Sequence, residues 1–137
     1  MENEIIGWLA YYLGVGLGLS GSAWGLSVAF SAALATDQKQ FFGVIPLAVL
    51  PSTQGIYSLI GGILMLPNVK ERPEVGGILL LVGLACFVSG IFQGKVCASG
   101  IRAINEEKNT LGNGIISAAM PETYAVFAFV CLFLLAG

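Results

Sequence analysis

The sequence predicts an all-α membrane protein whose four transmembrane helices form a duplicated antiparallel hairpin. Hydrophobic residues make up 56% of the chain and charged residues only 10%, and the charges cluster in short breaks between long apolar runs. This pattern is typical of a polytopic membrane protein. The runs long enough to cross a bilayer are Ile5 to Thr36, Phe41 to Val69, Val75 to Ser99 and Ile115 to Gly137. We expect a single membrane domain over residues 1–137, with hairpins at about 5–69 and 75–137.

The first helix is rich in small residues, which let helix backbones approach closely inside a membrane. They are concentrated at Gly14, Gly16, Gly18, Ser20, Gly21, Ser22 and Gly25, so we expect an inner, tightly packed helix. No Lys-Ser or Lys-Thr follows them, as a phosphate-binding loop would require. The chain starts with acidic residues and lacks a convincing cleavage site, so we interpret this span as mature helix rather than a signal peptide.

The second helix contains a polar cluster within an apolar span. The short polar break before it, residues 36–40, predicts an antiparallel hairpin with the first helix. The cluster reads Leu50-Pro51-Ser52-Thr53-Gln54-Gly55-Ile56-Tyr57. Pro51 removes one backbone hydrogen bond and frees nearby carbonyls, which a bound ion or a neighbouring hydroxyl could satisfy.

The third helix follows a stretch of mixed charges with two prolines, Leu66 to Glu74, which we interpret as an external turn between the hairpins. This helix begins at about Gly76 and precedes a charged loop from Arg102 to Lys108. It carries Gln93 near its centre. Lys95 is expected to extend toward an interface or to face a polar interior.

The fourth helix carries Glu122 inside an otherwise uncharged apolar run. Glu122 lies about ten residues, or about 15 Å of helix, from the entry at Gly112 to Gly114, too far for its short side chain to reach the interface. An ionisable group at such depth is costly and is a functional hypothesis by default. Gln54 and Gln93 lie at a similar distance from their own loops, so the three side chains are predicted to share one depth.

An internal repeat supports the duplicated hairpin. We align Ser20-Gly21-Ser22 with Gln93-Gly94-Lys95, and Leu50-Pro51-Ser52-Thr53 with Met120-Pro121-Glu122-Thr123. Ser52 then takes the position of Glu122, and the chain is predicted to carry one ion-binding charge.

Other classes of function are disfavoured by composition. Histidine is absent, and the three cysteines, Cys86, Cys97 and Cys131, lie within apolar spans without metal-ligand spacing, which argues against a transition-metal or disulfide function. The chain also lacks the basic stripe that a nucleic-acid partner would require.

These motifs resemble the membrane-ring proteolipid of rotary V-type ATPases, called subunit K or proteolipid c, in its duplicated four-helix form. The resemblance covers the whole chain and rests on residues 50–57, 90–96 and 121–124. It is strongest to the sodium-transporting bacterial branch. It implies an ion site made of the Glu122 carboxylate, the amide oxygens of Gln54 and Gln93, the Thr53 hydroxyl and the Leu50 carbonyl. Tyr57 would hydrogen-bond the carboxylate and Pro51 would support the site. Ser52 stands where glycine is usual.

The resemblance also implies partners and location. The protein would not be an enzyme on its own; identical copies would form a rotor ring in the cell membrane. The ring would turn against a stator protein with an arginine, driven through a central stalk by ATP-hydrolysing subunits. With a slight excess of basic residues at Lys39, Arg102 and Lys108, the resemblance places the hairpin loops in the cytoplasm and the termini outside.

The predicted coupling ion is Na⁺, because a hard cation needs several oxygens to replace its hydration shell. The alternative is H⁺, with both glutamines only hydrogen-bonding a protonated Glu122. A small multidrug exporter is a further alternative, but that family carries its Glu in the first helix. A purely structural four-helix protein would leave the shared depth of Gln54, Gln93 and Glu122 to chance. Ring-sized particles in detergent would distinguish a rotor-ring subunit from the exporter and from the purely structural protein.

Overall fold

The computed structural model describes residues 1–136, and Gly137, the end of the predicted fourth span, lies outside them. The described chain consists of helices joined by short turns. In order they are α1 (Glu2–Leu34), α2 (Gln38–Ala48), η1 (Leu50–Ser52), α3 (Thr53–Glu71), η2 (Pro73–Val75), α4 (Gly76–Asn105) and α5 (Leu111–Ala136). Within residues 1–136, four segments are long and apolar enough to cross a membrane: Glu2–Leu34, Gln38–Glu71, Pro73–Asn105 and Leu111–Leu135. The predicted all-helical membrane fold is confirmed.

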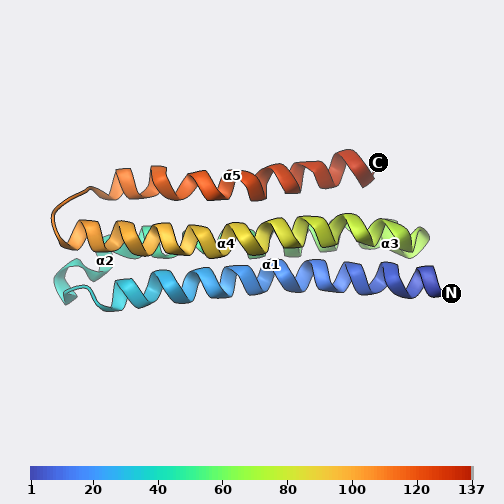
Figure 1. Cartoon of the computed structure of the whole chain (residues 1–137), viewed down its shortest axis with the longest axis horizontal. Helices are drawn as coiled ribbons and strands as arrows, with labels where there is room; N and C mark the ends of the chain where they lie inside the picture. The colour runs from blue at the N-terminus through green and yellow to red at the C-terminus, as the bar shows by residue number, and fades with distance from the viewer. Residues whose placement is uncertain (137) are drawn as a thin grey trace.

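The helices run lengthwise beside one another. Figure 1 shows α1 and α4 side by side and pointing the same way, with α5 on the far side of α4 and α3 behind α4. The first residue and the end of α5 lie at one end of the molecule, and the loops after α1 and α4 lie at the other. Helix α1 makes its most extensive contact with α4, and α4 makes its next most extensive contact with α5.

Glycines hold α1 and α4 at close distance. Gly14 and Gly83 face each other, and a Cβ atom added at Gly83 would overlap the Gly14 carbonyl oxygen. Gly21 and Gly90 form the next pair, where a Cβ at Gly90 would lie 2.8 Å from the Gly21 carbonyl carbon and oxygen. The tight packing predicted for the first helix is therefore present.

The glycine pairs correct the register of the internal repeat. Gly21 lies opposite Gly90, and a Cβ added at Gly94 would meet Gly25. The predicted match of Gly21 with Gly94 is therefore wrong by one helical turn. The contact depends on glycines that recur at seven-residue spacing in both helices, as at Gly14 and Gly21, and a short three-residue match does not capture that spacing.

The second membrane segment, predicted as one helix with a hydrogen bond missing at Pro51, is broken near its middle. Helix α2 ends at Ala48, residues Leu50–Ser52 form the 3₁₀ turn η1, and α3 begins at Thr53. Pro51 has no N–H to donate to a helical hydrogen bond, so the regular α-helix is interrupted. This turn contacts both α1 and α4, and Pro51 is buried within it.

The turn between the hairpins is shorter than predicted. Helix α3 continues through Pro67 to Glu71, which leaves Arg72 and η2 as the connection. Val69 is fully buried in a cluster with Tyr11 and Val75, and burial of such a side chain favours continuing the helix at the cost of one backbone hydrogen bond.

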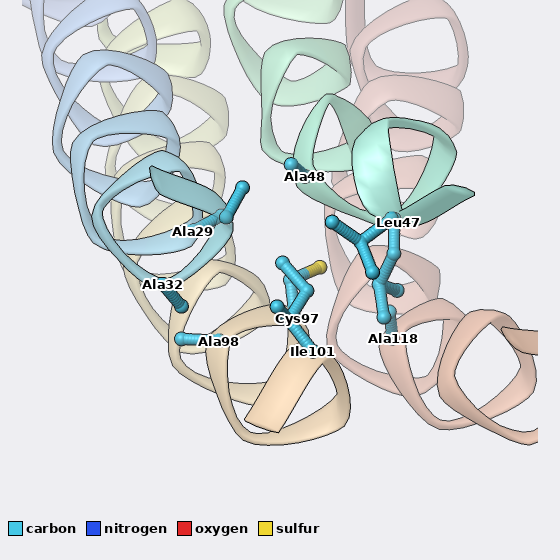
Figure 2. Close-up of a cluster of buried hydrophobic side chains, with 10 residues drawn as sticks. Ala29, Ala32, Leu47, Ala48, Cys97, Ala98, Ile101 and Ala118 are labelled. Atoms are coloured by element: carbon cyan, nitrogen blue, oxygen red, sulfur yellow. The ribbon is translucent and has the colours of Figure 1, made fainter. Parts of the chain in front are cut away.

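The other loop is also shorter than predicted. Helix α4 includes Arg102 and ends at Asn105, so the loop covers only residues 106–110. Ile101 is fully buried with Leu47 and Ala118, and Figure 2 shows these side chains gathered between α2, α4 and α5. Their packing extends α4 beyond its most apolar part.

Candidate ion-binding site

Glu122 lies on α5 directly after Pro121 and is partly buried. Both of its carboxylate oxygens accept hydrogen bonds. The Tyr57 hydroxyl of α3 donates to Oε1 at 3.0 Å, and the Gln93 amide nitrogen of α4 donates to Oε2 at 3.0 Å. An ionised carboxylate only accepts hydrogen bonds, and these two donors suit that form.

Gln93 connects α4 to both neighbouring helices from a fully buried position. Besides Glu122, its Nε2 donates to the Ala118 carbonyl of α5 at 2.9 Å. Its Oε1 accepts from Gln54 Nε2 of α3 at 2.7 Å. Because both amide protons of Gln93 point to α5, its oxygen must face α3.

Gln54 is equally buried. Its side-chain oxygen lies near two other oxygens from the same membrane segment, those of Thr53 and Leu50. Its Oε1 lies 3.3 Å from Thr53 Oγ1, and the same hydroxyl lies 3.0 Å from the Leu50 carbonyl oxygen, to which it donates. The 3₁₀ turn at Pro51 therefore brings a backbone, a hydroxyl and an amide oxygen together on one side of Gln54.

The structure thus assembles the predicted site residues into one connected group. Tyr57, Glu122, Gln93 and Gln54 form a continuous hydrogen-bonded chain. Among the described residues, Thr53 and Leu50 join this chain through Gln54. Pro51 is buried next to them at the break.

Ser89 is a member of the site that sequence reasoning missed. Its Oγ accepts from Gln54 Nε2 at 3.1 Å and donates to the Pro121 carbonyl oxygen at 2.7 Å. It lies one helical turn before Gln93 on α4, a spacing that places two side chains on the same helix face. The four-residue spacing from Gln93 could therefore have identified Ser89 from the sequence.

Two other predicted features lie apart from the carboxylate. Ser52, which takes the place of Glu122 in the first hairpin, donates its hydroxyl to the Val49 carbonyl at 2.7 Å. Lys95 is exposed, and its amino group lies 5.1 Å from the centre of the Phe92 ring. Within residues 1–136, the side-chain hydrogen bonds of Glu122 are therefore with Tyr57 and Gln93.

The acceptor atoms of this group are all oxygens. Within the described part of the chain, no group of three or more His, Cys, Asp or Glu side chains is placed to hold a metal ion. Carboxylate, amide, hydroxyl and carbonyl oxygens instead suit hard cations. The arrangement can offer such an ion one negative charge and several neutral oxygens.

Comparison with known proteins supports the same conclusion. Residues 9–65 and 76–135 each match the family of the ATP synthase C subunit. The chain belongs to this family. The two matched segments coincide with the two hairpins, so each hairpin is one copy of the family unit. Members of this family carry ions for ATPase complexes and are not themselves catalytic, as the resemblance implied.

Two relatives show the similarity in more detail. The chain is 38% identical over 127 residues to the V-type sodium ATPase subunit K of Enterococcus hirae, an alignment that covers 88% of this chain and 77% of that protein. It is 36% identical over 138 residues to the A-type ATP synthase subunit K of Methanocaldococcus jannaschii, covering 93% of this chain and 62% of that protein. The chain is therefore a multi-pass membrane protein and a ring subunit of the V- and A-type ATPase family.

Proposed function

We propose that this protein carries Na⁺ as the rotor ring turns, with Glu122 binding and releasing the ion. The proposed ligands are the Glu122 carboxylate, the amide oxygens of Gln93 and Gln54, Thr53 Oγ1 and the Leu50 carbonyl oxygen. The observation that carries the proposal is that α3, α4, α5 and the break at Pro51 bring the five residues that supply these oxygens into one hydrogen-bonded cluster.

The number of oxygens favours a cation over a proton. A proton needs only the carboxylate and one hydrogen-bond partner, whereas a hard cation must replace several water ligands. Gln54 and Gln93 are each fully buried, and burying polar groups is costly unless they are well satisfied. A cation among their oxygens would satisfy the remaining lone pairs. The sodium pump named for the Enterococcus hirae relative agrees with this choice.

The charge of Glu122 would couple binding to rotation. With Na⁺ bound, the site is neutral and can face lipid. Without it, a bare carboxylate in lipid is costly, so the empty site is confined to the interface with a stator protein, where an arginine can balance the charge. ATP hydrolysis by soluble subunits would drive the ring through a central stalk, and each site would exchange its ion as it passes the stator.

The two loops at one end of the molecule, residues 35–37 and 106–110, are the proposed contacts for the stalk. Figure 1 shows them on the side opposite the first residue. Lys39, Arg102 and Lys108 lie near these loops, and basic residues are enriched in cytoplasmic loops. We place this end in the cytoplasm and the termini outside.

The experiment is protection of Glu122 from a hydrophobic carbodiimide in purified rings. Na⁺ at neutral pH should slow labelling, and Gln93→Ala or Thr53→Val should raise the Na⁺ concentration needed for half protection. Thr123→Val is the matched control, because Thr123 is next to Glu122 but its hydroxyl bonds to the Ala119 carbonyl at 2.9 Å. Equal effects of Thr53→Val and Thr123→Val would contradict the assigned ligands.

A proton is the second candidate for the coupling ion. The hydrogen-bonded chain from Tyr57 to Gln54 connects the site residues without a cation, which is the observation that favours it. In that case millimolar Na⁺ would give no protection, and only raised pH would slow the labelling of Glu122. That result would replace Na⁺ by H⁺ while leaving the ring role intact.

A further inference from the structure

Ser89 joins the two halves of the proposed site from a nearly buried position, with 5% of its surface exposed. Its hydroxyl hydrogen-bonds both the Gln54 amide and the Pro121 carbonyl, which directly precedes Glu122. Its single hydroxyl proton is donated to the Pro121 carbonyl oxygen at 2.7 Å. Toward Gln54 the Ser89 oxygen can therefore act only as an acceptor.

This direction determines which way the Gln54 amide is turned. A flipped amide would point its oxygen at Ser89 Oγ and at Gln93 Oε1. The Ser89 hydroxyl could donate to that oxygen only by leaving the Pro121 carbonyl, and Gln93 Oε1 carries no proton to donate. With the observed orientation, both Gln54 protons are used, at 3.1 Å to Ser89 and at 2.7 Å to Gln93. The Gln54 oxygen is then left facing Thr53 and Leu50.

We propose that Ser89 is a positioning residue that holds the Gln54 oxygen toward the bound cation. The inference rests on the proposed function, since it concerns the same site and the same class of ligand, a small hard cation. Ser89 acts on the cation only through Gln54. Without its hydroxyl, Gln93 alone orients the Gln54 amide, and rotamers that turn the NH₂ group toward the cation become accessible. Those rotamers replace an attractive ligand by a repulsive one.

The test measures the Na⁺ and Li⁺ concentrations that half-protect Glu122 from carbodiimide in intact rings. Ser89→Ala should raise the Na⁺ value roughly three- to tenfold, the range expected for one hydrogen bond. It should also change the ratio of Li⁺ to Na⁺, because a mobile amide discriminates ion size less well. Ser89→Thr keeps the hydroxyl and should restore most of the wild-type affinity.

Ser58→Ala is the matched control. Ser58 is a buried serine whose hydroxyl bonds to the Gly14 carbonyl at 2.9 Å, within the α1 and α3 contact. Its loss should leave both half-protection values unchanged. If Ser89→Ala rings do not assemble, Ser89→Cys, which fills the site with a slightly larger side chain but accepts hydrogen bonds weakly, should show the same shift.

The outcomes separate the two proposals. If wild-type rings are not protected by Na⁺, the proposed function is wrong. If wild-type rings are protected, and Ser89→Ala binds Na⁺ within twofold of wild type or shifts no more than Ser58→Ala, the role of Ser89 is wrong while the function stands.

Discussion

Gly90→Ala tests whether the close contact of α1 with α4 sets the geometry of the site. The added Cβ would lie 2.8 Å from the Gly21 carbonyl carbon and oxygen and 3.1 Å from the Ser22 nitrogen. These are backbone atoms, so no side chain can rotate away. Ordinary contact begins at 3.4 Å, so the helices must separate by about 0.6 Å. Overpacking of this kind costs about 1–3 kcal/mol, against about 1 kcal/mol gained in helix propensity.

The assay is the temperature at which purified rings dissociate in detergent, compared with Gly77→Ala on the same helix. No atom lies within 4 Å of a Cβ added at Gly77, so only the helix propensity should change there. We expect Gly90→Ala to lower the dissociation temperature and to weaken Na⁺ protection, because Gly90 adjoins Ser89 and precedes Gln93 by one turn. Equal behaviour of the two variants would refute the argument.

Three further predictions concern single side chains. Glu122→Gln should abolish Na⁺ transport and carbodiimide labelling yet leave ring size in detergent unchanged, because the amide keeps the shape but cannot alternate between charged and ion-bound states; labelling elsewhere would contradict this. Tyr57→Phe should raise the Na⁺ concentration that half-protects Glu122 roughly tenfold or more, as expected for loss of a hydrogen bond to a charged group. The same change at the exposed Tyr124 should leave that concentration unchanged. Lys108→Gln should raise the pKa of the Glu106 carboxyl to its usual value, since Lys108 lowers that pKa by a hydrogen bond and by its charge; an unchanged NMR titration would exclude this cause.

Sequence reasoning predicted the spans and a lost backbone hydrogen bond at Pro51 because hydropathy and proline chemistry act locally, but it kept this segment as one helix, whereas the structure divides it into α2, η1 and α3. It also predicted that Gln54, Gln93 and Glu122 share a depth, since depth follows from counting residues along a helix. The continuation of α3 through Pro67 could not be predicted in this way. It depends on the burial of Val69 against another helix, which is a tertiary contact.

Ser89 was missed for a related reason. A serine in an apolar helix is common and carries no charge, so its sequence position alone does not mark it. Its importance follows from what lies opposite: the Gln54 amide of α3 and the Pro121 carbonyl of α5. The predicted alignment of the two repeats was wrong for the same reason, because the alignment depends on how the glycines of α1 face those of α4.

The serine at position 52 has a consequence for energy conversion by the whole ring. If Glu122 is the ion site, each copy contributes one site for four membrane segments. A ring of given circumference then moves about half as many ions per turn as a ring of two-helix subunits with a carboxylate each. Moving one charge across 100 mV costs about 2.3 kcal/mol, so an ATP that moves fewer ions can work against a larger membrane potential. Such a ring is suited to pumping ions rather than to making ATP.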